Sequence, residues 1–276
     1  MATQTVQEEA RKADRVLNPA PAVEVVNVTK TYTVGHTDYP ALRGVSFKIG
    51  KGELVSIVGP SGSGKSTVLN LIGALDRPTS GKVFVDGINL RKLNEDKLSL
   101  LRNRKIGFVY QSFNLIQRLT SIENVEMPLI SRGVSENARR VKAAKMLKLV
   151  GLGRKMNKRP TELSGGEQQR VAIARALVAE PAIVIGDEPT GNLDSKTTME
   201  ILDLVVQMNK KKGITFVLVT HNQEVAEMTH HIISIRDGLV EKEQILHRFD
   251  SFTGNEIAQP QALAPTIPIP DLERTP

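Results

Sequence analysis

The chain has 276 residues, of which 40 % are hydrophobic and none is cysteine, and it carries a formal net charge of +7. The hydrophobic fraction is enough to form the core of one large domain or of two closely packed lobes. The lack of cysteine excludes disulfides and thiolate metal sites. No apolar run approaches the roughly 20 residues of a membrane-spanning helix, and residues 1–22 lack the apolar segment of a secretory signal. We therefore expect a cytosolic protein that requires a partner for any role at a membrane.

The positive charge lies in the middle of the chain. Residues 1–22 carry three basic and three acidic groups and residues 250–276 carry one and four, which leaves 33 basic against 23 acidic groups between them. The densest stretch, 135–170, holds ten basic and three acidic residues. Such a stretch can attract nucleic acid, anionic lipid or nucleotide, and it can equally be the solvated face of a helix.

Runs of β-branched residues alternate with helical patterns along the chain, which predicts an α/β fold. The early runs at 23–33, 45–49 and 82–85 predict a small antiparallel β subdomain. The later runs at 182–186 and 215–219 are almost continuously apolar, which indicates a mainly parallel sheet covered on both faces.

Residues 113–164 show helical periodicity and no convincing strand, so we expect an α-helical subdomain inserted into the α/β core. The whole domain is expected to span residues 23–249. Residues 1–22 are predicted to be a flexible extension. Residues 250–276 contain five prolines and are predicted to be a disordered tail.

A glycine-rich segment follows the strand pattern at 53–58 and opens a helical pattern, which is the context of a P-loop. Its glycines allow backbone N–H groups to face phosphate oxygens, and the helix N-terminus adds positive potential. Lys65 would neutralise the β- and γ-phosphates of ATP, and Ser66 would offer its hydroxyl to Mg²⁺. The candidate nucleotide-binding residues of the loop are Gly59, Pro60, Ser61, Gly62, Ser63, Gly64, Lys65, Ser66 and Thr67.

Two adjacent carboxylates, Asp187 and Glu188, follow the buried strand at 182–186. The carboxyl ends of parallel strands form the edge where ligands bind in such folds. Asp187 is expected to hold Mg²⁺ through water, and Glu188 to orient and deprotonate the water that attacks the γ-phosphorus. An isolated Asp-Glu pair is more often a surface turn, but its place after a buried strand in a P-loop chain favours the functional interpretation.

The most specific motif is Leu-Ser-Gly-Gly-Glu-Gln at 163–168, which matches the signature of ABC ATPases. The chain resembles this family over residues 23–247, which implies a P-loop NTPase core. The family's other motifs follow in the expected order: the Q-loop at Tyr110 and Gln111, the D-loop at 191–194, and a histidine motif at Thr220 and His221.

The resemblance implies a chemical role for several of these residues. Gln111 is expected to meet Mg²⁺ and the attacking water, and His221 to contact the γ-phosphate. With Glu188, these two are the candidate catalytic residues. The candidate magnesium ligands are Ser66, Gln111 and Asp187.

The resemblance also predicts that a second copy of the chain completes the nucleotide site. Ser164, Gly165 and Gly166 are expected to close on the ATP of the other copy, and Asp194 is counted with the nucleotide-binding residues. A signature at the far end of the helical insert cannot serve the nucleotide of its own chain. An ATP-dependent head-to-tail dimer is therefore expected.

One aromatic residue, Tyr32, lies where the family places a ring under adenine, and stacking of a base on an aromatic ring is favourable. Tyr39 is a rival for this role, and a structural tyrosine with no ligand contact is the alternative.

Gly186 departs from the family pattern, because many family members have a bulkier apolar residue there. We expect this departure to affect local packing only.

Five segments look most like the macrolide-exporter and lipoprotein-release branch of the family, at residues 27–35, 39–47, 106–116, 120–130 and 187–197. That branch implies a separate permease with few membrane helices and a large extracytoplasmic part, with this chain on the inner face of the membrane. The alternative is an ABC ATPase that acts on nucleic acid, but the tandem cassettes or long heptad segments of such proteins are absent, so no nucleic-acid partner is expected. A catalytically inactive module would be expected to have lost Lys65, Asp187 or Glu188, and all are present.

The Q-loop and the start of the helical insert, from Gln111 to about residue 129, are predicted to dock the permease. The reason is a set of apolar residues that could form a groove, although they could equally be the core of the subdomain. They are Phe113, Leu115, Ile116, Leu119 and Ile122.

Overall fold

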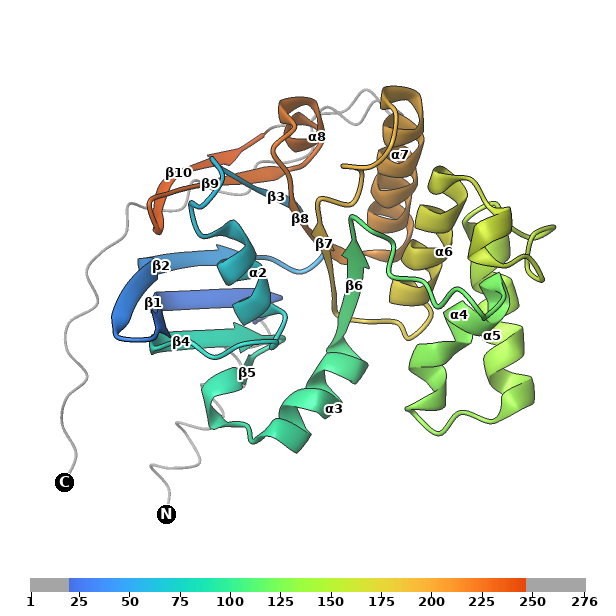
Figure 1. Cartoon of the computed structure of the whole chain (residues 1–276), viewed down its shortest axis with the longest axis horizontal. Coiled ribbons are helices and arrows are strands. Elements are labelled where there is room, and N and C mark those ends of the chain that lie inside the picture. The colour runs from blue at the N-terminus through green and yellow to red at the C-terminus, as the bar shows by residue number, and fades with distance from the viewer. Residues whose placement is uncertain (1–19, 247–276) are drawn as a thin grey trace, which may run out of the picture.

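The computed structural model describes residues 20–246 and contains one four-stranded and one six-stranded sheet (Figure 1). Residues 1–19 of the expected extension and the whole of the expected tail lie outside the described residues. The smaller sheet has the order β2-β1-β4-β5 with antiparallel neighbours. Its strands are β1 (Val23–Val34), β2 (Thr37–Ile49), β4 (Ser80–Val85) and β5 (Ile88–Asn89). The predicted antiparallel subdomain is thus confirmed.

The larger sheet has the order β10-β9-β3-β8-β7-β6, and all its neighbours are parallel except the antiparallel pair β9 and β10. Its strands are β3 (Leu54–Val58), β6 (Ile106–Tyr110), β7 (Ile183–Asp187), β8 (Thr215–Val219), β9 (His231–Arg236) and β10 (Leu239–Ile245). Asp237 and Gly238 join β9 to β10 with φ angles of 48° and 75°. Asp-Gly readily adopts positive φ at both positions of a tight hairpin turn.

Alternate residues of β8 face two different hydrophobic cores. Phe216 and Leu218 pack into the core that contains the helical part of the chain, whereas Val217 and Val219 pack into the core shared with the smaller sheet. Successive side chains of a strand point to opposite faces, so a strand covered on both sides must be apolar at every position. This packing explains the continuous apolar run in the sequence.

The helices divide between the two sides of the parallel sheet (Figure 1). They are α2 (Lys65–Ile72), α3 (Glu95–Lys105), α4 (Ser121–Ile130), α5 (Glu136–Leu149), α6 (Gly165–Leu177), α7 (Ser195–Lys212) and α8 (Gln223–Glu227), with short 3₁₀ helices at Leu90–Lys92 and Pro160–Glu162. Residues 113–164 contain α4 and α5 and no strand, as the periodicity predicts. None of the helices between residues 20 and 246 combines the length and apolar character that crossing a bilayer requires.

A buried histidine ties together three strands of the larger sheet. His231 Nδ1 lies 3.5 Å from Glu53 Oε2, just before β3, and its Nε2 lies 3.4 Å from Glu243 Oε2 on β10. Burial by itself lowers the pKa of His231, but the two carboxylates outweigh it and raise the pKa to about 9. The imidazolium therefore remains charged at neutral pH.

We expect His231 to make the stability of the fold depend on pH above neutrality. Its pKa in the folded chain exceeds the usual value of about 6.5, so its contribution is complete below about pH 6.5 and is lost as the pH rises through 9. His231→Gln removes this titration and keeps a polar side chain of similar size. Denaturant unfolding at about pH 7 and about pH 10 should show a larger loss of stability in the wild type than in the variant. Equal losses would contradict the ion-pair assignment.

Candidate functional site

The P-loop connects β3 to α2 and packs closely against neighbouring backbone. Gly59 has a φ of 148°, and a Cβ there would lie 2.0 Å from the Ile235 carbonyl oxygen. Gly64 has a φ of 106° at the N-cap of α2, and a Cβ there would lie 2.7 Å from the Ala41 carbonyl oxygen. Only glycine fits either position, so these two glycines of the loop follow from its close packing.

The loop has unsatisfied donors of the kind that bind phosphate. No side chain caps the N-terminus of α2, and the buried Ser63 hydroxyl has no hydrogen-bond partner among the described residues. Lys65 Nζ donates to the carbonyl oxygens of Gly59 and Pro60 at 2.9 and 2.7 Å, so the ammonium group lies over the loop. A helix N-terminus with free N–H groups and a lysine is a favourable site for a phosphate anion.

The predicted carboxylates lie at the carboxyl end of β7. Asp187 is half-buried, and its pKa is raised by burial first and by the charge of Glu188 second, while Lys65 opposes both effects. A cation at this position would stabilise the ionised carboxylate, and hard oxygen ligands suit Mg²⁺. The residues present therefore fit the expected metal.

Glu188 and His221 meet across neighbouring strands. Glu188 has a φ of 46°, and its backbone N–H donates to the Val219 carbonyl oxygen of β8 at 3.0 Å. Its Oε1 lies 3.1 Å from Nδ1 of His221, two residues beyond β8. The His221 side chain is 69 % exposed, so it is accessible to a bound ligand. The two candidate catalytic residues therefore lie side by side at one edge of the sheet.

The structure places the Gln111 side chain on the D-loop. Its Nε2 donates to Asn192 Oδ1 at 3.1 Å, and Asn192 Nδ2 donates back to the Gln111 carbonyl oxygen at 3.1 Å. The contact needs a glycine at 191, where a Cβ would lie 2.7 Å from Gln111 Nε2. The expected contacts of Gln111 with Mg²⁺ and water remain predictions.

The signature caps and seats a helix. The Ser164 hydroxyl accepts from the Glu167 N–H at 3.3 Å, and Glu167 Oε2 accepts from the Ser164 N–H at 3.0 Å, which forms a capping box at the start of α6. A Cβ on Gly166 would lie 2.4 Å from Cγ2 of Thr197. The glycine thus allows α6 to pack onto the first turn of α7.

Asp194 is the N-cap of α7. Its Oδ1 accepts from the Thr197 N–H at 3.0 Å and its Oδ2 accepts from the Thr197 hydroxyl at 2.6 Å. These two hydrogen bonds, the hydroxyl first, lower the pKa of Asp194. Both carboxylate oxygens are engaged in capping, and the expected nucleotide contact of Asp194 remains a prediction.

Tyr32 lies on β1 beside the first turn of the P-loop helix. Its hydroxyl donates to Asp76 Oδ2 at 2.9 Å, and Lys30 Nζ lies 4.7 Å from the ring centroid. Burial and Asp76 raise the pKa of Tyr32, while the nearby Thr67 hydroxyl lowers it. Tyr39 pairs with Tyr32 across β1 and β2. Contact with Thr67 of the P-loop favours Tyr32 over Tyr39 as the adenine-stacking residue.

Two amide side chains in the site make contacts that the sequence did not predict. Asn192 holds Gln111, and the fully buried Gln169 donates from α6 to the Pro189 carbonyl oxygen after β7. Gln169 thereby joins the signature helix to the loop that follows the catalytic carboxylate. A polar residue on the buried face of a helix is the signal that could have found Gln169. Asn192 belongs to the predicted D-loop, but its pairing with Gln111 could not be predicted from the motif. The small space beside Gly186 is filled by Leu218 and Pro189, which accounts for the glycine there.

A groove of about 450 Å³ lies between α3, β6, α4 and α6, and Leu75, Tyr110 and Pro128 are among its lining residues. The structure corrects part of the expected docking surface, because Leu115 and Ile122 are buried in the core of the helical subdomain. Ile122 lies on the buried face of α4, and Leu115 belongs to the segment before α4 and packs into the same core. Leu75 is an exposed apolar residue of the groove, and the chain segments that contribute Asn114 and Pro128 to it also carry the exposed apolar residues Ile116, Met127 and Ile130.

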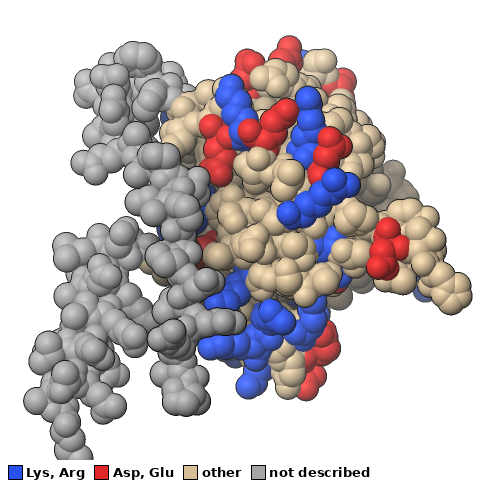
Figure 2. Space-filling view, turned by 90° about the vertical axis from the view of Figure 1, so that its left-hand side faces the viewer, with Lys and Arg blue, Asp and Glu red and all other residues tan. Residues whose placement is uncertain are grey.

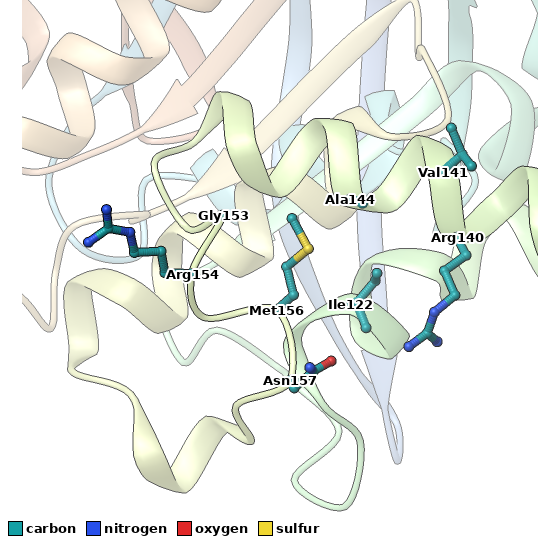
Figure 3. A pocket seen from close by; sticks show the side chains of 8 residues that line it. All are labelled: Ile122, Arg140, Val141, Ala144, Gly153, Arg154, Met156 and Asn157. Atoms are coloured by element: carbon teal, nitrogen blue, oxygen red, sulfur yellow. The ribbon is translucent and has the colours of Figure 1, made fainter.

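A second pocket, of about 390 Å³, lies between α5 and the segment that leads to the signature (Figure 3). Ile122 and Met156 form its apolar part, and Arg140 lies on its rim. Arg140 also lies 3.8 Å from the buried Glu126 carboxylate, which offsets part of the positive charge of this helix.

Charge is mixed on the face of the molecule that Figure 2 shows. Figure 2 shows acidic and basic side chains interleaved over the upper part of one face and basic side chains gathered toward its lower end. A protein that follows a nucleic-acid backbone usually has a continuous basic stripe. The upper part of this face does not have that character.

Known proteins with related sequences and structures have the same domain. The family model described as ABC transporter matches residues 42–191. The lipoprotein-releasing system ATP-binding protein LolD of Alcanivorax borkumensis is 44 % identical over 82 % of this chain and 99 % of its own length. The macrolide export ATP-binding/permease protein MacB of Syntrophobacter fumaroxidans is 48 % identical over 80 % of this chain, which covers 31 % of that protein. A dimeric ATP-binding cassette of Methanocaldococcus jannaschii, bound to ADP and Pi in a post-hydrolysis state, is 50 % identical with a TM-score of 0.75, covering 82 % of this chain and all of its own.

A phosphate-binding loop and a pair of carboxylates at the carboxyl edge of a parallel sheet define a P-loop nucleoside triphosphatase. Together with the matches, these features show that the chain belongs to the ABC transporter family, as an ATP-binding subunit with ATPase activity. The comparisons give no support to the nucleic-acid alternative.

Gly166→Ala should separate the signature helix from α7. Its added methyl group would lie 2.4 Å from Thr197 Cγ2, so we expect a loss of about 1–3 kcal/mol in the free energy of unfolding. Thr197→Ser removes that methyl group and keeps the hydroxyl bonded to Asp194. In urea unfolding, Gly166→Ala should therefore cost much less stability in the Thr197→Ser background than in the wild type. No recovery would mean that the α6 to α7 contact is not the cause.

Proposed function

We propose that two copies of this chain enclose ATP between them and transmit the effect of its hydrolysis to a separate membrane permease. One observation carries the proposal: within one chain, the P-loop helix α2 and the signature helix α6 lie on opposite sides of β6 and β7 (Figure 1). A nucleotide on the P-loop is therefore far from the signature of the same chain. The dimeric state of the similar cassette from Methanocaldococcus jannaschii supports this reasoning.

Each nucleotide site would combine residues of both copies. Lys65, Gln111 and His221 of one copy would face the phosphates, and Tyr32 would stack on adenine. Ser164, Gly165 and Gly166 of the other copy would close the site, with N–H groups at the start of α6 directed at the γ-phosphate. The capping box leaves the Ser164 side chain exposed for such an approach.

Hydrolysis would depend on residues at the ends of β7 and β8. Glu188 accepts the proton of the attacking water, and its 3.1 Å contact with His221 keeps the carboxylate at the edge of the sheet. Mg²⁺ would be held by Ser66 and Asp187, and it would neutralise part of the phosphate charge. Asn192 holds Gln111 on the D-loop, so Gln111 reaches this centre only when that pair opens.

The permease would bind along the groove between α3, β6 and α4. Leu75 is an exposed apolar residue of the groove, and strand β6 of the Q-loop forms part of its lining. Ile116, Met127 and Ile130 are exposed apolar residues that lie within two residues in the sequence of its lining residues Asn114 and Pro128. The similar proteins LolD and MacB are named for lipoprotein release and macrolide export, which supports a permease with a large extracytoplasmic part as the partner. The chain would then lie on the cytoplasmic face of the membrane, where ATP is supplied.

Glu188→Gln should stop turnover and accumulate the closed pair. Loss of the general base should reduce ATP hydrolysis at least about 100-fold, while nucleotide binding through Lys65 is retained. Analytical ultracentrifugation should show monomers without nucleotide and dimers with ATP, and Lys65→Ala should bind nucleotide more weakly. A variant with wild-type phosphate release would exclude Glu188 as the base.

Adding Ser164→Arg to Glu188→Gln tests the head-to-tail arrangement. The arginine should block the approach of the second copy, so the double variant should remain monomeric with ATP while still binding it. The matched control is Lys92→Arg in the Glu188→Gln chain, at an exposed position outside the signature. A Ser164→Arg variant that dimerises as well as this control would contradict a signature acting in trans.

Charges on the segments that border the groove should uncouple the chain from the membrane. Met127→Glu and Ile116→Glu introduce carboxylates at exposed positions, so basal ATP hydrolysis should persist while binding to membrane vesicles from the source organism is lost. Val141→Glu is the matched control, because Val141 is an exposed apolar residue of α5, which contributes no residue to the groove. Equal sedimentation of all three variants with the vesicles would place the dock elsewhere.

A further inference from the structure

A basic groove of about 470 Å³ lies between α5 and the ends of α6 and α7, away from the nucleotide site. Four lysines line it: Lys142, Lys145 and Lys148 on α5, and Lys212 at the end of α7. Between them lie Met146 and Leu149, and Leu149 is exposed although it is apolar. The groove therefore combines positive charge with an apolar floor.

These lysines lack acidic partners in the described part of the chain. None of the four makes an ion pair within residues 20–246, and the single carboxylate that lines the groove belongs to Glu180. The lysines of α5 are spaced three residues apart, so they lie along one side of the helix and repel one another. Arg139 on the same helix, in contrast, pairs with Glu126. An acidic occupant would offset the charge of the lysines.

The described chain ends at the same edge of the sheet as this groove. The last strand, β10, is antiparallel to its neighbour, so its carboxyl end lies where the parallel strands begin. The Leu246 N–H donates to the His230 carbonyl oxygen at 2.8 Å. The His230 N–H donates in turn to the Leu54 carbonyl oxygen, also at 2.8 Å. Leu54 pairs in turn with Phe216. Three strand spacings, about 14 Å, therefore separate Leu246 from the start of β8, and that strand begins three residues after Lys212.

The sequence beyond Leu246 has the complementary chemistry. Residues 250–257 read Asp-Ser-Phe-Thr-Gly-Asn-Glu-Ile, with carboxylates at Asp250 and Glu256 and apolar side chains at Phe252 and Ile257. At about 3.3 Å per residue, these residues can extend from roughly 13 to 36 Å beyond Leu246. They can therefore reach both the α7 and the α5 sides of the groove.

We propose that residues 250–257 dock in the basic groove of their own chain, with Asp250 and Glu256 on the lysines and Phe252 on the Met146 and Leu149 floor. The segment then connects α5 to the end of α7. Because the groove lies at the amino-terminal edge of the sheet, docking leaves the P-loop and the signature accessible. The proposal is independent of how the chain uses ATP.

Lysine reactivity in the full chain tests the docking. Asp250→Asn/Glu256→Gln removes both charges at nearly unchanged size, so labelling of the four groove lysines by an amine-reactive reagent should rise about threefold, as measured by mass spectrometry. Lys92 and Lys97 are exposed control lysines outside the groove and should not change. About 1 M salt should raise the reactivity of the groove lysines in the wild type in the same way. Equal reactivity of wild type and variant at low salt would overturn the proposal.

Two further measurements separate this occupant from others. If the protection of the groove lysines from labelling weakens when the wild type is diluted, a second copy supplies the segment. That result would overturn docking within one chain. Protection that requires added phosphatidylserine vesicles would identify a lipid surface as the occupant and would also overturn it. In the supporting outcome, protection is independent of concentration and needs no vesicles. Reversing the charges, as Lys145→Glu/Lys148→Glu with Asp250→Lys/Glu256→Lys, should then restore the slow labelling of Lys142.

Discussion

A methyl group on Gly59 would lie 2.0 Å from the Ile235 carbonyl oxygen, so the P-loop and β9 approach each other as closely as backbone allows. The contact is reinforced where the Gly238 N–H donates to the Ser63 carbonyl oxygen at 3.0 Å. The tight turn between β9 and β10 therefore packs against the phosphate loop and holds it in place. Lys65 opens α2 directly after this loop, and its Nζ donates to two of the loop's carbonyl oxygens.

Neighbouring parallel strands then bring the rest of the chemistry to the same edge. β7 ends at Asp187 and β8 precedes His221, so their pairing sets the distance between carboxylate and imidazole. Glu188 adopts a positive φ, which costs on the order of 1–3 kcal/mol for a residue other than glycine. Its N–H bond to β8 and the bond from the Gly191 N–H to its carbonyl oxygen hold this conformation. Such strain is typical of positions where a side chain must be directed at a ligand.

The helical subdomain is joined to this edge through amide side chains. Gln169 connects α6 to the loop after β7, and Asn192 connects the D-loop to Gln111. A movement of the signature or of a permease in the neighbouring groove would therefore act on loops that border the catalytic residues. The contacts between Gln111 and Asn192 are exposed, and hydrogen bonds of this kind contribute only about 0.5–1.5 kcal/mol each, so a bound nucleotide can displace them.

The sequence by itself determined the fold class, the P-loop, the paired carboxylates and the signature, because each depends on neighbouring residues and on the periodicity of one segment. It could not determine which apolar residues of 113–122 are exposed, and Leu115 and Ile122 proved to be core. Nor could it locate the partner of Gln111, which lies 81 residues away in the chain. The capping role of Asp194 and the basic groove at the end of α7 also depend on how helices pack. Only the tertiary structure decided these points, since the free energy of a side-chain contact depends on which distant segments the fold brings together.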